Sequence, residues 1–166
     1  MPSKALLLSL FLLGGCQNAQ PPAASPAAPS PDERRKELNE QAGKLLWTNP
    51  DEARMRLEQA SMLPADDATT WARTKVAMGN VYMIKKQPEN ALEAWLPILE
   101  RRKEVHPAIV SSTCQEIAQV YRQVGDKENA KRYFRLAVEY GKKVQYKYDY
   151  EAAVKALEEL ERENAK

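Results

Sequence analysis

The apolar residues of this chain follow three successive patterns. Residues 5–13, "ALLLSLFLL", form an apolar run in which Ser9 is the only polar residue. Residues 17–31 are mainly proline, alanine and serine, with no charged and no large apolar side chain. Beyond residue 33, apolar and small residues recur at the three- and four-residue spacing of helices that bury one face. The pattern predicts an apolar leader, an uncharged spacer without a core of its own, and one all-α domain.

The last helical stretch shows this spacing most clearly. Within residues 142–166 one face is charged and the other is an apolar stripe of Tyr150, Ala153, Val154, Leu157 and Leu160. We expect a final helix here that covers the open apolar end of a stack of helices. In an alternative interpretation, the tyrosines of "YKYDY" (146–150) form an exposed aromatic patch.

A nine-residue motif occurs three times, as "NPDEARMRL" (49–57), "QPENALEAW" (87–95) and "DKENAKRYF" (126–134). Each copy has an alanine after a short acidic turn and a large apolar residue four positions later. The alanines are Ala53, Ala91 and Ala130, and the large residues are Leu57, Trp95 and Phe134. Prolines at 50, 88 and 107 suit the first position of a helix, so they predict where three of the helices begin.

Before each motif a small residue is followed, three positions later, by a large one. These pairs are Gly43 with Leu46, Gly79 with Tyr82, and Ala118 with Tyr121. Two helices approach to about 8–10 Å only where the contact residues are small. Glycine inside a helix costs about 1 kcal/mol relative to alanine, so the pattern, at Gly79 above all, predicts close helix packing.

This arrangement resembles the tetratricopeptide repeat, a helix-turn-helix unit of 34 residues with a small and an aromatic residue in fixed places on each helix. The resemblance covers about residues 33–141 and implies repeats at 33–65, 66–104 and 105–141. The implied fold is all-α: about three repeats in a short right-handed solenoid, closed by a capping helix in 142–166. Asn39, Lys75 and Cys114 replace the first-helix tryptophan of the family. A plain helical bundle with chance alanines is the alternative.

The spacing of the later repeats exceeds that of the family. Gly79 and Ala118 lie 39 residues apart, as do Ala91 and Ala130. We expect the extra residues to lengthen the helices around "LERRKEVHP" (99–107).

The apolar run ends in "LGGC", residues 13–16, which resembles the lipobox of bacterial lipoproteins. A run of this length suits a signal peptide and is too short to span a bilayer. The resemblance implies a signal peptide at 1–15, lipid modification of Cys16, and a disordered linker over 16–32. Gln17, in place of aspartate, favours the periplasmic face of the outer membrane. The alternative is an ordinary secretory signal that ends in a chance cysteine.

The chain offers little catalytic chemistry. His106 is the only histidine, and the glycines beyond the leader are too far apart for a phosphate-binding loop. Cys114 is the only thiol beyond Cys16, and we expect it to be buried in a helix. We therefore predict no catalytic residue, no metal site and no cofactor. With 25 basic and 23 acidic residues and a net charge of +2, no nucleic-acid partner is expected either.

A stack of helix pairs exposes a concave face lined by the first helix of each pair. The residues expected on this face form a polar groove for a protein or an extended peptide: Lys44, Arg73, Asn80, Met83, Gln115, Gln119 and Arg122. Alternatively, each of them is simply a solvated surface residue. The leading hypothesis is a lipid-anchored periplasmic scaffold, either a monomer or a homodimer, that localises or assembles an envelope machine as the pilotin-type lipoproteins do. An adaptor of a periplasmic peptidase or cell-wall enzyme is the alternative, ahead of an enzyme.

Overall fold

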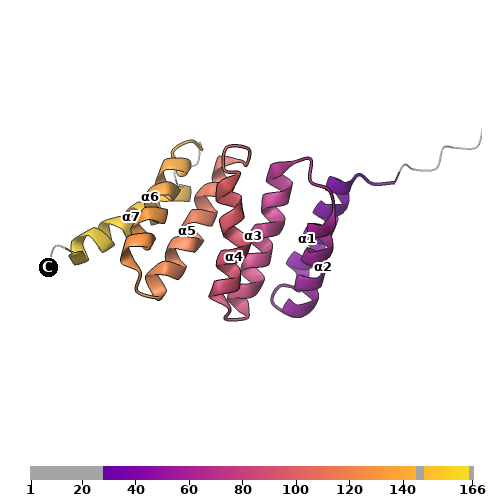
Figure 1. Cartoon of the computed structure of the whole chain (residues 1–166), viewed down its shortest axis with the longest axis horizontal. Coiled ribbons are helices and arrows are strands. Elements are labelled where there is room, and N and C mark those ends of the chain that lie inside the picture. The colour runs from indigo at the N-terminus through magenta and orange to yellow at the C-terminus, as the bar shows by residue number, and fades with distance from the viewer. Residues whose placement is uncertain (1–27, 145–147, 165–166) are drawn as a thin grey trace, which may run out of the picture.

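A computed structural model describes residues 28–144 and 148–164, and all regular structure in these residues is α-helical (Figure 1). The helices lie side by side along the long axis of the molecule, in chain order. They are α1 (Pro31–Leu45), α2 (Pro50–Met62), α3 (Ala68–Ile84), α4 (Pro88–Glu100), α5 (Pro107–Gln123), α6 (Lys127–Gly141) and α7 (Tyr148–Asn164).

Polar residues and prolines determine where the helices begin. Pro50, Pro88 and Pro107 each occupy the first position of a helix, as predicted. The N-cap Asn49 accepts a hydrogen bond at 3.2 Å from the backbone N–H of Glu52. His106 is exposed, and its Nδ1 accepts a hydrogen bond at 3.3 Å from the backbone N–H of Ala108, so the one histidine of the chain caps α5. These caps satisfy backbone donors that have no partner within the helix.

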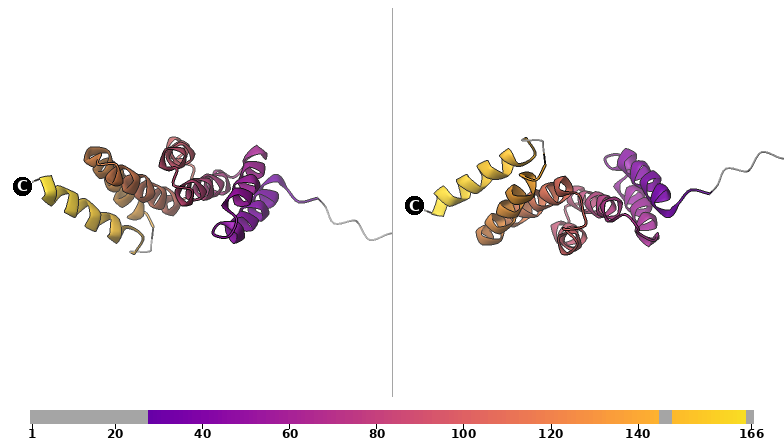
Figure 2. Two further views of the ribbon diagram at one scale, coloured as in Figure 1. Left: turned by 90° about the horizontal axis from the view of Figure 1, so that it is seen from below. Right: turned by 90° about the horizontal axis from the view of Figure 1, so that it is seen from above.

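The helices form two rows. α1 pairs with α2, α3 with α4, and α5 with α6, while α1 also contacts α3, α3 contacts α5, and α5 contacts α7. The first helix of each pair and α7 therefore make one continuous row. In the described part of the chain, the Cα atoms of α2, α4 and α6 do not come within 8 Å of one another. The helix axes turn along the stack, as the two further views show (Figure 2). The chain is an all-α helical repeat solenoid closed by a terminal helix, which confirms the predicted fold class.

The repeated alanine and large apolar residue form the core of every pair. Ala53, Ala91 and Ala130 are fully buried, and so are the three large residues that follow them, Leu57, Trp95 and Phe134. This part of the prediction is confirmed in all three pairs. Burial of each large side chain contributes about 1.5–3 kcal/mol of hydrophobic free energy.

Gly79 of α3 packs directly against Trp95 of α4. A Cβ atom at this position would lie 2.0 Å from Nε1 of Trp95 and 2.2 Å from Cε2. The same indole nitrogen donates a hydrogen bond at 3.2 Å to the backbone carbonyl of Val76, which fixes the ring against α3. The prediction of tight packing at Gly79 is therefore confirmed.

Two expectations about the repeats are wrong. Gly43 is exposed, and a Cβ there would meet nothing within 4 Å, so it is not a packing position. The large residue that corresponds to Trp95 in the first pair is Leu57, which has no indole ring to accommodate. The extra length around "LERRKEVHP" is not helical either, because α4 ends at Glu100 and residues 101–106 form a turn.

The terminal helix α7 covers the apolar end of the third pair. From the predicted stripe, Ala153 and Leu160 are buried and Leu157 packs against the core; Ala156, outside the stripe, is buried as well. A Cβ on Gly141 would lie 2.4 Å from Cβ of Tyr150, so the glycine admits the start of α7. Of the alternative aromatic patch at residues 146–150, residues 146 and 147 lie outside the described residues.

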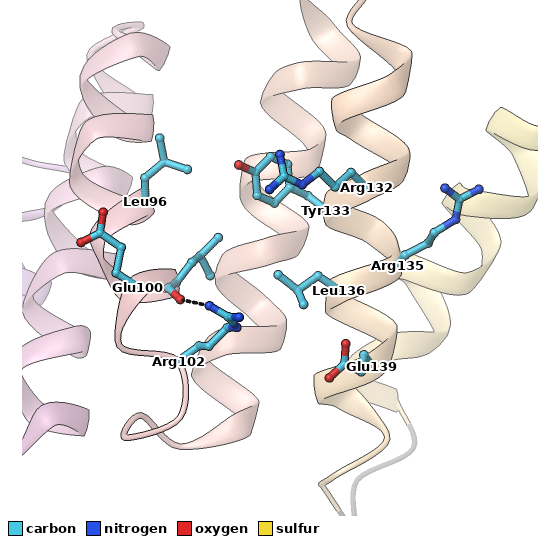
Figure 3. A pocket seen from close by; sticks show the side chains of 9 residues that line it. Leu96, Glu100, Arg102, Arg132, Tyr133, Arg135, Leu136 and Glu139 are labelled. Atoms are coloured by element: carbon cyan, nitrogen blue, oxygen red, sulfur yellow. Dashed lines mark hydrogen bonds between the residues drawn. The ribbon is translucent and has the colours of Figure 1, made fainter.

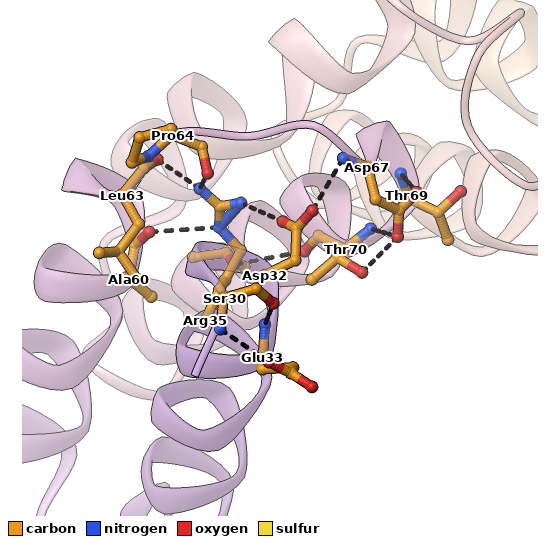
Figure 4. A network of polar contacts seen from close by, with 11 residues as sticks. Ser30, Asp32, Glu33, Arg35, Ala60, Leu63, Pro64, Asp67, Thr69 and Thr70 are labelled. Carbon is orange, nitrogen blue, oxygen red and sulfur yellow. Dashed lines mark hydrogen bonds and ion pairs between the residues drawn. The ribbon is translucent and has the colours of Figure 1, made fainter. Parts of the chain in front are cut away.

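A buried arginine holds the first two pairs together (Figure 4). Arg35 has no exposed surface, and its guanidinium donates to the carbonyl oxygens of Ala60, at 3.3 Å, and of Leu63 and Pro64. It also forms an ion pair at 3.1 Å with Asp32. The second carboxylate oxygen of Asp32 accepts a hydrogen bond from the backbone N–H of Asp67. The network connects the start of α1 to the end of α2 and to the loop that leads into α3.

Candidate functional site

The candidate site is the inner face, which we define as the surface of α1, α3 and α5 that points away from α2, α4 and α6. The predicted groove residues come from these three helices. Whether they form one surface depends on the helical stripe to which each belongs.

A hollow of about 550 Å³ opens between the middle of α1 and the start of α3. Its walls are polar: Lys36, Asn39 and Glu40 come from α1, and Asp67, Thr69, Thr70 and Arg73 come from the start of α3. Of the predicted groove residues, Arg73 lines it, from an exposed position. The Oδ1 atom of Asn39 is buried and accepts no hydrogen bond from the described residues.

Asp67 is the N-cap of α3, and its carboxylate oxygens are used in that role. Its carboxylate accepts hydrogen bonds from the Thr70 hydroxyl and, at 3.0 Å each, from the backbone N–H groups of Thr69 and Thr70. The Thr70 side chain in particular, with the two backbone donors, lowers the pKa of Asp67 below its ordinary value. The carboxylate is therefore ionised at neutral pH, and its hydrogen bonds are already used to cap α3. The basic side chains of Arg73 and Lys36 remain available to bind a ligand.

Asn80 continues the same stripe of α3. It lies seven residues after Arg73, which is close to two helical turns, and it is half-buried. Met83 lies one turn further and is also half-buried, but it packs against the hydrophobic core. The inner surface of α3 therefore changes from charged to amide to apolar along its length.

The groove residues of α5 differ in how far they are engaged. Gln119 is exposed, whereas Gln115 is half-buried and has an interaction partner. Arg122 forms an ion pair at 3.2 Å with Glu159 of α7. The ion pair thus links the α5 end of the inner face to the terminal helix. Gln119 is the exposed amide side chain at this end.

Lys44 belongs to another surface. It is exposed and lines a separate hollow with Arg34, Glu37, Gln41, Leu45 and Arg56, at the side of α1 that faces α2. The structure thus places Arg73, Asn80 and Gln119 on neighbouring helices of the inner face, and it places Lys44 apart from them.

Sequence reasoning missed a second and larger hollow of about 720 Å³ between α4 and α6, which we call the outer groove (Figure 3). Its apolar lining consists of Leu96, Leu99, Tyr133 and Leu136. Its charged lining consists of Glu100, Arg102, Arg132, Arg135 and Glu139. The only related feature of the sequence is the excess repeat length near residue 100, since Arg102 lies in that turn, and this length alone does not predict a groove.

The two residues of reactive type that sequence analysis considered within the described chain, His106 and Cys114, both have structural positions, since His106 caps α5 and Cys114 lies in the core. Cys114 is fully buried, and burial raises the pKa of its thiol to about 12, so it is not a nucleophile at neutral pH. Among the residues described, no cluster of His, Cys, Asp and Glu side chains could hold a metal ion. No helix within 28–144 or 148–164 is both long enough and apolar enough to cross a membrane.

These features define the molecule as a helical repeat solenoid with shallow, open hollows on its surface. The family model of the tetratricopeptide repeat matches residues 111–140, which cover most of α5 and α6. Searches of curated proteins and of solved structures found no match. Tetratricopeptide repeats generally bind protein partners and are typically non-catalytic, so a protein-interaction scaffold is the role that the fold supports.

Proposed function

We propose that this chain is a lipid-anchored scaffold that binds an extended segment of a partner protein on its inner face. The observation that carries the proposal is the continuous row of α1, α3, α5 and α7, together with the repeat match over α5 and α6. Such a row exposes one long surface without a deep cavity, which suits a peptide better than a small molecule.

The side chains of the inner face suit a peptide backbone. Asn80 and Gln119 each carry an amide that both donates and accepts, as a peptide bond does. Arg73 is positioned for a carboxylate at one end of the segment. Within the described residues, these three side chains have no hydrogen bond or ion pair of their own, so a partner need not displace an internal contact.

The membrane anchor is the second part of the proposal. Cys16 lies outside the described residues, and the support for its lipidation is the apolar run that ends in "LGGC". Acyl chains gain about 0.8 kcal/mol per buried methylene, so more than one chain gives stable attachment. The protein would then work at the periplasmic face of the outer membrane, in the localisation or assembly of an envelope machine such as a pilus or secretion system.

A capture experiment tests the inner face. Proteins are co-purified from crosslinked cell envelopes with wild type and with an Arg73→Ala, Asn80→Ala, Gln119→Ala variant. The matched control replaces Gln59, Glu89 and Glu128, which are exposed on α2, α4 and α6, by alanine. We expect the partner to be lost from the inner-face variant and kept by the control. Equal recovery from both variants would refute the inner face as the binding surface.

The anchor is tested separately. Cys16→Ala should abolish incorporation of a fatty-acid analogue and release the protein from the membrane fraction, while Cys114→Ala should leave both unchanged. Labelling that persists in Cys16→Ala would show that the lipobox interpretation is wrong.

A further inference from the structure

The outer groove is an open surface with an apolar floor. α5 contacts both α4 and α6, so it closes the back of the groove, while no Cα atom of α4 lies within 8 Å of one in α6 in the described part of the chain. Leu96 from α4 and Leu136 from α6 point into the space between these helices (Figure 3). Both are half-buried, so each packs against the core and still presents apolar surface.

Tyr133 stiffens the floor. Its side chain is nearly buried, and its ring stacks on that of Tyr121 of α5, with the centroids 5.4 Å apart and the planes within 5° of parallel. A floor that is fixed before binding loses little conformational freedom when a partner docks.

The two guanidinium groups that face the groove have no carboxylate partner within the described residues. Arg102 and Arg132 are exposed and point towards the groove from opposite sides (Figure 3). Arg102 donates to the backbone carbonyl of Leu99 at 2.8 Å, and Arg132 lies over the ring of Tyr133 at 5.5 Å from its centroid. These contacts orient the side chains and leave their charge unneutralised.

The remaining charges of the lining are engaged or turned away. Arg135 pairs with Glu161 of α7 at 3.0 Å, and Glu139 pairs with Lys143 at 3.0 Å. The carboxylate of Glu100 points away from α6 (Figure 3). The charge available inside the groove is therefore positive, although the chain as a whole is nearly neutral.

We infer that the outer groove is a second docking site, independent of the inner face, and that it binds an acidic amphipathic segment of a partner protein. Apolar side chains of the segment lie on Leu96 and Leu136, and its carboxylates pair with Arg102 and Arg132. Arginine suits this role because its planar guanidinium can bind both oxygens of a carboxylate. The leucine floor favours a protein segment over a nucleic acid, for which bases would need aromatic faces or hydrogen-bonding edges.

Peptide display tests this inference and does not require an identified partner. A library of random peptides is selected on the purified full-length protein, with counter-selection on an Arg102→Glu, Arg132→Glu variant. Selected peptides should carry a net negative charge with leucine-like residues at regular spacing. Their dissociation constants are then measured by fluorescence anisotropy for wild type, the double variant and an Arg73→Glu control on the inner face.

The double variant should bind the selected peptides at least about tenfold more weakly, since it replaces two attractive charge pairs by two repulsions. The control should bind them as wild type does, and affinity should fall with added salt. Circular dichroism checks that both variants are folded, as expected for substitutions at exposed positions. Selection of neutral or basic peptides, or a loss of binding in Arg73→Glu but not in the double variant, would overturn the inference.

Discussion

Replacing Gly79 by alanine should destabilise the protein, although alanine is the better helix former. The new Cβ would lie 2.0 Å from Nε1 and 2.7 Å from Cδ1 of Trp95, whose ring is fully buried and cannot move aside freely. Either the indole shifts or α3 and α4 separate. Both changes weaken the core that α3 and α4 share.

The magnitude follows from three contributions. Over-packing of a core typically costs about 1–3 kcal/mol, and displacement of the indole would break its 3.2 Å hydrogen bond to Val76, which is worth about 1 kcal/mol. The higher helix propensity of alanine returns about 1 kcal/mol. We therefore expect Gly79→Ala to lower the free energy of unfolding by about 1–3 kcal/mol.

Gly43→Ala is the matched control, because a Cβ at Gly43 meets nothing within 4 Å. With no steric cost, the gain in helix propensity should stabilise the protein by about 0.5–1 kcal/mol. Urea denaturation followed by circular dichroism measures both effects. The reasoning would be refuted if Gly79→Ala were as stable as wild type, or if the two substitutions changed stability in the same direction.

Three further outcomes follow from the structure. Arg35→Met should lower the free energy of unfolding by about 2–4 kcal/mol in urea denaturation, because it leaves Asp32 without its ion pair and the carbonyl groups of Ala60, Leu63 and Pro64 without their donor. The exposed neighbour Arg34→Met should change it by less than about 0.5 kcal/mol, and equal effects would contradict the buried network. Asp67→Ala should cost about 1 kcal/mol at pH 7. Because the folded-state pKa of Asp67 lies below its ordinary value of 3.8, this difference should shrink as the pH falls below 3.8 and through the folded-state pKa, and a difference that grew at low pH would exclude the cap. Cys114 should resist alkylation in native protein at pH 8 and react fully in urea, as mass spectrometry would show; rapid native labelling would place the thiol at the surface.

The repeated pairs were predictable because their signal is local. An alanine and a large apolar residue four positions apart lie on one face of the same helix, so their burial follows from helical geometry alone. Gly79 was equally predictable, since a glycine inside a helix needs a packing reason. Gly43 has the same spacing to its large residue, but no large ring like that of Trp95 packs against it. The spacing alone therefore does not show that a glycine is a packing position.

Features that depend on several distant segments were not predictable. Arg35 lies in a charged stretch of α1, and its burial requires carbonyl groups from Ala60, Leu63 and Pro64 to converge on it. The outer groove likewise depends on the separation of α4 and α6, and its lining residues from the two sides lie at least 30 positions apart. Neither arrangement leaves a periodic pattern in the sequence.

Site-specific photo-crosslinking in cells tests the central claim, that the inner face binds a protein, most directly. A photoreactive amino acid is placed at the exposed Gln119 on the inner face of α5 or, in a separate variant, at the exposed Gln59 on α2. We predict a discrete protein adduct from position 119 that is lost on Arg73→Ala, Asn80→Ala substitution, and no such adduct from position 59. No adduct at position 119, or one that is also formed at position 59, would contradict the assignment of the inner face as the binding surface.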